Sequence, residues 1–296
     1  MDASDLRIFE AVARLGAMNR AATELNTVQS NVTARIRALE GELKTPLFRR
    51  HRGGVALTSA GERLLPYALR IRRMIDEARR AALDDGTPKG RLTVGALEST
   101  AAHRLSPLLA GYVAAHPAVD LVLRTGTTCE LIDKTLAHEV DGAFVCGPVD
   151  HRELVAEAVF REELVLLTAR GARGLAALAQ VHDLKLVVLR AGCSYRQRLE
   201  AILAARGIVA TRLLEFGTLD AIIACVAAGL GVTLLPRTVV AQATRDRRVT
   251  QHELAPAEAA VETLFIRRRD TYVSSALAAF LDAARRAERT AANAAE

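Results

Sequence analysis

Apolar positions recur at helical spacing in the first twenty-five residues. In the first segment the apolar side chains lie three or four residues apart, at Leu6, Phe9 and Ala13. Gly16 is expected to end this helix, because glycine readily adopts the left-handed conformation that follows a helix. Asn19 is the expected N-cap of a second helix, residues 20–25. The pattern therefore predicts an amphipathic helix followed closely by a shorter one.

A third helix is predicted over residues 28–40, after a tight turn at 26–27. It would bury Val32, Ile36 and Leu39 and leave a different face polar, with Gln29, Ser30, Thr33 and Arg37. A glutamine suits adenine and an arginine suits guanine in the major groove. Two helices joined by a tight turn, the second with polar residues at its start, are typical of a helix-turn-helix.

Residues 47–58 follow a predicted turn at Gly41 and have the pattern of a small β-hairpin. Their tip is basic, with Arg49, Arg50 and Arg52 close together. A hairpin in this position is the wing of a winged helix-turn-helix. Its arginines are expected to lie on phosphates or in the minor groove.

A long helix is predicted to follow the wing and to end near 84–86. Ser59 and Glu62 have the spacing of a capping box at its start. Along it, small and aliphatic residues are separated by four, three, four, three and four positions, at Leu64, Ala68, Ile71, Ile75, Ala78 and Ala82. Such a stripe favours packing against a second helix, which would belong to a second copy or to the same chain.

The pattern changes after a hinge-like segment at 86–90. Short apolar runs then alternate with helical segments, at 92–95, 121–123, 142–145, 164–167, 186–189, 213–216, 232–235 and 264–266. This alternation predicts an α/β domain with largely parallel sheets. Ligands of such domains bind beyond the carboxyl ends of the strands.

Four of the expected strand-to-helix junctions carry small polar residues, at 98–100, 126–128, 192–194 and 217–218. Each offers a hydroxyl and the free N–H groups of a helix start, which attract anions. They are either ordinary N-caps or parts of one cleft. In the second case the cleft would suit a small carboxylate or a neutral polar metabolite.

Charge is concentrated near the N-terminus. Residues 1–90 hold 16 Lys and Arg against 11 Asp and Glu, a net +5 out of the total +6. Local positive charge of this kind is expected of a nucleic-acid surface, although a solvated basic face gives the same count.

Other classes of protein lack support in the sequence. The start has no secretory signal and no run of 18 apolar residues occurs, so a cytoplasmic protein is expected. The four cysteines stand far apart, without a Cys-x-x-Cys pair, and predict neither a metal site nor a disulfide. No nucleophile elbow, phosphate loop or zinc-protease helix is present, so no enzyme activity, catalytic residue or cofactor is predicted.

Residues 4–66 resemble the DNA-binding domain of the LysR-type transcriptional regulators. The shared positions include Leu6 and Phe9, Ala21-Ala22 and Leu25, Gln29-Ser30, Val32-Thr33, Leu39-Glu40, Leu47 to Arg50 and Leu57 to Gly61. The sequence departs from the family at Met18-Asn19 and at Ala34, where many members place an arginine. Arg35 is the candidate for the missing base contact.

Residues 91–290 resemble the family's periplasmic-binding-protein-like sensor, with the best local match at 226–236. The resemblance implies a winged helix-turn-helix at 1–58, a dimerising linker helix and hinge at 59–87, and an effector-binding domain at 88–296. Lobe I would comprise about 91–160 and 267–296, and lobe II about 163–266. The residues expected near the effector are Ser99, Thr100, Thr127, Cys193, Tyr195, Arg196, Phe216 and Thr218.

The function implied is that of a DNA-binding regulator whose promoter binding is modulated by a small-molecule effector. A homotetramer built from dimers would contact two neighbouring DNA sites and RNA polymerase. The residues expected on DNA are Arg20, Thr27, Gln29, Ser30, Thr33, Arg35, Arg50 and Arg52. Two alternatives remain at this point: a regulator of the same architecture that senses oxidants through Cys193, and a small-molecule enzyme.

Overall fold

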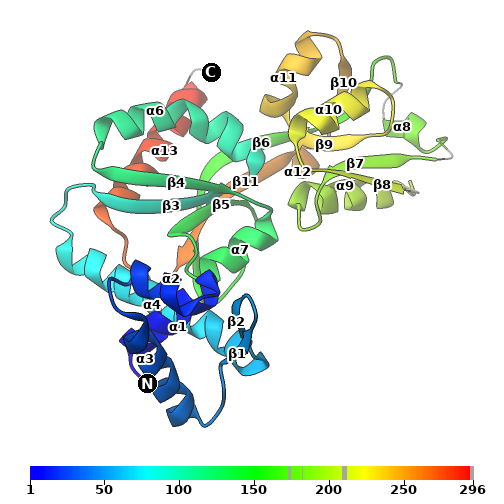
Figure 1. Ribbon diagram of the computed structural model, residues 1–296. Helices are drawn as coiled ribbons and strands as arrows, with labels where there is room; N and C mark the ends of the chain where they lie inside the picture. Colours follow the sequence, from blue (N-terminus) through cyan, green and yellow to red (C-terminus); the bar gives the residue numbers. More distant parts are fainter. Residues whose placement is uncertain (173–174, 182, 209–211, 294–296) are drawn as a thin grey trace. The chain divides into compact units, whose positions relative to one another are not determined.

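The computed structural model describes residues 1–172, 175–181, 183–208 and 212–293 (Figure 1). The chain divides into two compact units, Met1–Asp84 and Asp85–Glu296. No helix in the described part of the chain is both long enough and apolar enough to cross a membrane.

The first unit is a helical bundle with a two-stranded hairpin. Its elements are α1 (Ala3–Leu15), α2 (Met18–Glu24), α3 (Gln29–Leu43), β1 (Phe48–His51), β2 (Gly54–Leu57) and α4 (Ser59–Leu83). Asp2 and Asp5 form a capping box at the start of α1, and Gly16 ends the helix with φ 65°. The core includes Phe9, Val32 and Leu39, each at most 1% exposed. Burial of such side chains contributes roughly 1.5–3 kcal/mol each.

Two helix boundaries differ from the sequence-based prediction. Asn19 is not the N-cap of α2, because Ala17 already has the extended conformation of a cap and the helix begins at Met18. The Asn19 side chain instead accepts a hydrogen bond from the Arg20 N–H at 2.9 Å. Gly41 is not a turn, because α3 continues to Leu43 and Lys44 takes the left-handed conformation with φ 51°. Gly41 suggested a turn in the sequence, although the residues on both sides of it belong to the helix.

The start of α4 also lies one residue earlier than the predicted capping box. Thr58 is the N-cap, and its hydroxyl accepts from the Gly61 N–H and donates to the Pro46 carbonyl at 2.7 Å. The contact with Pro46 explains the shift, since it holds the threonine hydroxyl in the capping position. The predicted pairing of Ser59 with Glu62 is therefore wrong.

The apolar stripe of α4 has two different environments. Ala68 is buried in the core of the first unit, and Leu64 and Ile71 pack against that core. Farther along the helix Ile75 is 37% exposed and Leu83 is 72% exposed. The first half of the stripe therefore packs against helices of the same chain, which was one of the two possibilities that the sequence left open. The second half remains uncovered in the single chain.

The second unit contains one large mixed sheet and a small one. The large sheet has the strand order β10-β6-β11-β5-β3-β4, with β9 also paired to β6, and the small one joins β7 to β8. The strands are β3 (Gly90–Ala96), β4 (Val119–Thr125), β5 (Gly142–Cys146), β6 (Leu154–Ala169), β7 (Lys185–Leu189), β8 (Arg212–Phe216), β9 (Thr233–Pro236), β10 (Val249–His252) and β11 (Ala260–Arg268).

The expectation of largely parallel sheets is wrong. Parallel pairing joins β3 to β4 and β5, and β7 to β8, whereas every named pair that includes β6 or β11 is antiparallel. The reason is β6, which is 16 residues long although only its last apolar run was predicted. Its first part pairs with β11 and its second part with β9 and β10.

The second unit has two lobes, and the long strand β6 runs from one into the other (Figure 1). Lobe I holds β3, β4 and β5 with α5 (Glu98–Thr100), the π-helical turn η1 (Ala101–Leu105), α6 (Ser106–Ala115), α7 (Thr128–Leu136) and α13 (Ser275–Asn293). Lobe II holds β7 to β10 with α8 (Leu175–Leu178), α9 (Ser194–Ala204), α10 (Leu219–Ala227), α11 (Arg237–Arg245) and α12 (Pro256–Ala259). In lobe I, Phe144 lies within 6.3 Å of the rings of Phe160, Phe265 and Phe280.

Candidate nucleic-acid interface and effector cleft

The first turn of α3 presents a polar, solvent-exposed surface. Gln29 and Ser30 are exposed, Thr33 is partly exposed, and the core side chains of the helix point the other way. Arg20, on the neighbouring helix α2, is also exposed. These predicted residues thus share one feature that a base-contacting surface needs, which is access from solvent.

Two residues of this turn were missed in the sequence. Val28 is the N-cap of α3 and is 65% exposed, which is unusual for a valine. Its methyl groups have the chemistry to contact a thymine methyl. Asn31 is exposed too, and its amide donates to the Thr27 hydroxyl at 3.0 Å. In the sequence, the feature that could have drawn attention to this turn is an apolar residue, Val28, directly before the polar start of α3.

Arg35 has partners inside the protein. Its Nε lies 2.8 Å from an Asp5 oxygen, and its Nη2 lies 3.2 Å from Asp2. The guanidinium therefore binds the acidic start of α1 in the free protein. This arrangement differs from a free arginine, because Nε and Nη2 already have carboxylate partners inside the protein.

The hairpin is fixed to the end of α1 by a glycine contact. The Val55 N–H donates to the Gly16 carbonyl at 2.9 Å. Gly54 has φ 140°, and a Cβ there would lie 2.3 Å from the same carbonyl oxygen. Only glycine fits, so the hairpin has a defined position. Arg52 is exposed in the turn between β1 and β2, while Arg50 lies on β1 opposite Val55 with its side chain outside the described residues.

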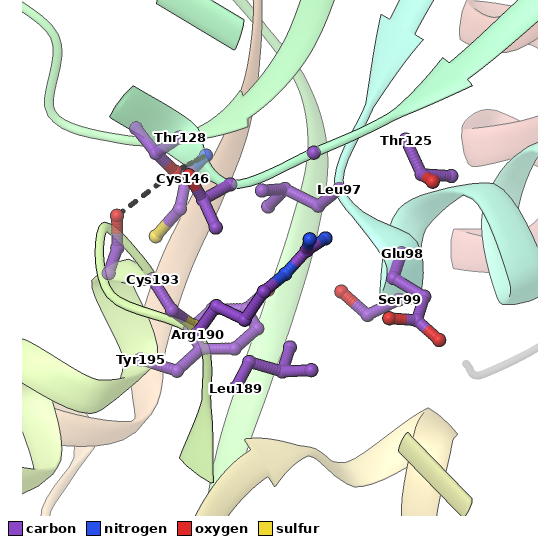
Figure 2. Close-up of a pocket in the computed structure, with 13 residues that line it drawn as sticks. Leu97, Glu98, Ser99, Thr125, Thr128, Cys146, Leu189, Arg190, Cys193 and Tyr195 are labelled. Carbon is purple, nitrogen blue, oxygen red and sulfur yellow. Dashed lines mark hydrogen bonds between the residues drawn. The ribbon is translucent and has the colours of Figure 1, made fainter. Parts of the chain in front are cut away.

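A small cavity lies between the lobes of the second unit (Figure 2). Its volume is about 40 Å³. Lobe I contributes three segments and lobe II contributes two, which comprise Leu97, Glu98, Ser99, Thr125, Gly126, Thr127, Thr128, Cys146, Leu189, Arg190, Cys193, Ser194 and Tyr195. Most of the polar groups in this lining are hydroxyls.

Three of the four predicted strand-to-helix junctions meet at this cavity. They are the start of α5, the start of α7 with its N-cap Thr127, and the start of α9 with its N-cap Cys193. At α7, Thr127 and Glu130 form a capping box that fixes the first turn. The fourth junction, at 217–218, does not line the cavity, and its Thr218 is the N-cap of α10, with its hydroxyl accepting from the Ala221 N–H.

One hydrogen bond links the two lobes across the cavity. The Ser194 hydroxyl on α9 donates to the Thr128 hydroxyl on α7 at 3.0 Å (Figure 2). The same Thr128 oxygen accepts from the Cys146 N–H at 3.4 Å. The bond is thus a direct contact between the starts of α9 and α7 beside the cavity.

The other predicted effector residues divide into two groups. Ser99, Thr127, Cys193 and Tyr195 line the cavity, whereas Thr100, Arg196, Phe216 and Thr218 do not. Arg196 binds Glu215 at 2.6 Å and Glu200 at 3.1 Å, so its predicted carboxylate partners are side chains of the protein. Phe216 packs against the apolar core under α10.

The cationic residue of the cavity is Arg190, which the sequence-based prediction missed. It directly follows β7 and extends toward Leu97 and Ser99 (Figure 2). The signal available was its place between the end of a strand and Gly192, whose φ of 89° marks the turn. The sequence pattern favours Arg196 instead, because it directly follows Cys193-Ser194-Tyr195.

The thiols of the cleft are poor candidates for redox chemistry. Burial raises the pKa of Cys146 to about 11 and also raises the pKa of Cys193. The thiolate is the reactive form, and it is therefore scarce at neutral pH. Cys129 is the exposed cysteine of this region. The oxidant-sensing alternative consequently gains no support from the geometry around Cys193.

Both units match models of known protein families. Residues 3–62 match the bacterial regulatory helix-turn-helix of the lysR family, and residues 85–289 match the LysR substrate binding domain. The transcriptional regulator GltR of Bacillus subtilis is 44% identical over 276 residues, which is 93% of each chain. CzcR of Bacillus cereus is 40% identical over 281 residues, which is 95% of this chain and 96% of that one.

Solved structures agree with this assignment. Full-length CbnR bound to its target DNA has a TM-score of 0.67 and 25% identity, covering 97% of this chain and all 100% of that one. OxyR from Pseudomonas aeruginosa shares the fold, with a TM-score of 0.69 at 21% identity over 96% of this chain and 95% of that one. The relatives are regulators, so the chain is not an enzyme. It belongs to the LysR family of bacterial transcriptional regulators, which bind promoter DNA through the helix-turn-helix and respond to small molecules through the C-terminal domain.

Proposed function

We propose that the first turn of α3 contacts base edges in the major groove of promoter DNA while the hairpin contacts the phosphate backbone. Gln29 and Ser30 would contact bases, with Thr33, Thr27 and Arg20 beside them, and Arg50 and Arg52 would contact phosphates or the minor groove. Arg35 would join only after leaving its aspartate partners. The observation that carries the proposal is the exposed, polar start of α3 next to a hairpin whose position is fixed by Gly54 and Gly16.

The exposed second half of α4 supports dimer formation. Met74, Ile75 and Leu83 present apolar surface that the single chain does not cover. We therefore assign residues 59–87 to a dimerising linker, residues 1–58 to DNA binding, and residues 88–296 to effector binding. Two copies would bind a partly palindromic site with increased effective concentration. A homotetramer of such dimers, placed in the cytoplasm with the chromosome, would then contact RNA polymerase.

The cleft between the lobes supports control by an effector. A ligand can shift the arrangement of the lobes only through a difference in its affinity for the two arrangements. The link between Ser194 and Thr128 gives the closed arrangement a specific contact. Effector binding would change this link, and with it the spacing of the DNA-binding units.

The experiment uses a duplex selected from a random library by the wild-type protein, compared with random DNA. Gln29→Ala is expected to reduce the preference for the selected duplex by roughly tenfold to a hundredfold, since a base contact contributes about 1–3 kcal/mol of discrimination. Arg52→Ala is expected to weaken both complexes and to lower the salt slope by about 1 for each protomer.

Arg124→Ala is the matched control, because this exposed arginine lies on β4 in the other unit. It is expected to leave both affinities unchanged. Equal losses on selected and random DNA for Gln29→Ala would contradict the assignment of the base-contacting face.

A further inference from the structure

The cavity between the lobes contains opposite charges on two of its walls. Arg190 belongs to lobe II and Glu98 to lobe I, and both line the cavity. Figure 2 shows Glu98 and Ser99 facing Arg190 and Leu189 across the space. All the other lining side chains are uncharged hydroxyl, thiol or apolar groups. A ligand that fills this cavity therefore meets one positive and one negative protein group.

Two helix starts, one from each lobe, add partial positive charge at the cavity. The helices α7 and α9 are 9 and 11 residues long, and both begin at the cavity. The N–H groups of Thr128 and Cys129 are in the first turn of α7, where no acceptor exists within the helix. Such N–H groups and the guanidinium of Arg190 together suit a carboxylate.

A buried hydroxyl of the same lining has no partner. Tyr195 is 4% exposed, and its hydroxyl makes no hydrogen bond among the described residues. A buried polar group without a partner is unfavourable. Tyr195 itself lines the cavity, but its hydroxyl oxygen is not accessible from it in this conformation, so the ligand is inferred from the two charges and the helix starts.

The size of the cavity limits the rest of the ligand. A volume of about 40 Å³ favours a compact ligand. Leu97 and Leu189 provide apolar surface for a short side chain. A large aromatic acid does not fit this conformation.

We propose that the effector is a compact zwitterionic α-amino acid. Its carboxylate binds Arg190 and the start of α7, and its ammonium group binds Glu98. This inference deepens the proposed effector control of DNA binding and rests on it. It also separates the ligand from simple carboxylates, which satisfy Arg190 but leave Glu98 without a cation.

The test measures ligand binding to the full-length protein by calorimetry and by thermal shift. The probes are L-alanine, L-serine and L-valine, with lactate and propionate as analogues that lack the ammonium group. At least one amino acid is expected to bind more tightly than the analogues by roughly tenfold to a hundredfold, because hydrogen bonds to charged groups have about this effect. Tighter or equal binding of lactate or propionate, or no binding of any amino acid in the set, would overturn the proposal.

Three variants test the assigned groups. Glu98→Gln is expected to reduce the preference for the amino acid over lactate, and Arg190→Gln is expected to weaken both ligands. Arg196→Gln is the control, since this arginine pairs with Glu200 and Glu215 outside the cavity, and it should retain the wild-type preference. An unchanged preference in Glu98→Gln would overturn the ammonium assignment. Because the preference is a ratio within one variant, a general loss of stability does not mimic it.

DNA binding by the same preparation distinguishes two kinds of failure. If the protein selects a duplex but no amino acid binds, the ligand proposal fails and the proposed DNA-binding function stands. If an amino acid binds but the protein has no preference among duplexes, the proposed function fails instead.

Discussion

Glu162→Gln is expected to destabilise the second unit because it removes the charge that faces a partly buried arginine. Arg104 donates to both Glu162 oxygens, at 2.7 and 3.1 Å, and Glu162 is only 5% exposed. Arg104 also donates to the Arg161 carbonyl and to Glu288 on α13, and it lies over the Phe160 ring. One cluster thus joins η1, which follows the cleft-lining α5, to β6 and to the last helix.

The magnitude follows from burial. Removing one partner of a fully buried pair costs about 3–5 kcal/mol. Arg104 is 18% exposed and keeps two other acceptors, so about 2 kcal/mol is expected here. For a unit of this size that corresponds to a decrease in Tm of about 4–8 °C. The assay is thermal and urea unfolding of the full-length protein, monitored in the transition of the second unit.

Glu157→Gln provides a matched control on the same strand. Glu157 binds Arg285 at 2.7 and 2.8 Å, but the two side chains are 44% and 37% exposed. An exposed pair contributes less than about 1 kcal/mol, so a decrease in Tm under about 3 °C is expected. Equal shifts in the two variants would refute the argument that burial decides the effect.

Three other predictions concern the second unit. An aromatic disulfide reagent at neutral pH should label the exposed Cys129 rapidly. It should label Cys146 and Cys193 slowly, because burial raises the pKa of both thiols. Rapid labelling of Cys193 would support an oxidant-sensing role. Burial lowers the pKa of His252 below 6.5, so the imidazole binds a proton more readily in the unfolded chain than in the folded one. The stability that the neutral ring contributes is therefore present above about pH 6.5. It is lost as the pH falls through the lowered pKa. His252→Asn should therefore show a smaller loss of Tm than the wild type between about pH 7.5 and about pH 5, and parallel curves would count against it. Ser194→Ala should cost about 1 kcal/mol in urea unfolding through loss of the link between the lobes, and no change would show that the link has no energetic role.

The sequence predicted the first unit well because its signals are local. Periodic apolar residues identified α1 and α3, and the hairpin follows from its turn residues. The start of α4 was predicted one residue late because a contact distant in sequence decides it. Thr58 replaces Ser59 as the N-cap because its hydroxyl binds Pro46, and no periodicity reports that contact.

Sheet direction and cleft membership were harder to predict because both depend on tertiary arrangement. The charged positions of β6 hid a continuous strand, since Glu162 and Glu163 break its apolar pattern. Of the four polar strand-to-helix junctions that the sequence offers for one cleft, three line the cavity and the one at 217–218 does not. Arg190 and Arg196 are both near a helix start in sequence, and only the fold shows that one faces the cavity while the other pairs with Glu215.

The dual use of α4 has a practical consequence for building chimeric regulators. Ala68 is buried with Phe9 and Leu39, so the first half of this helix completes the hydrophobic core of the DNA-binding unit. A fusion joined at Thr58 would remove that part of the core and expose apolar surface on α1. A junction placed after Asp84 keeps the complete unit, Met1–Asp84, and transfers the exposed half of the helix with it.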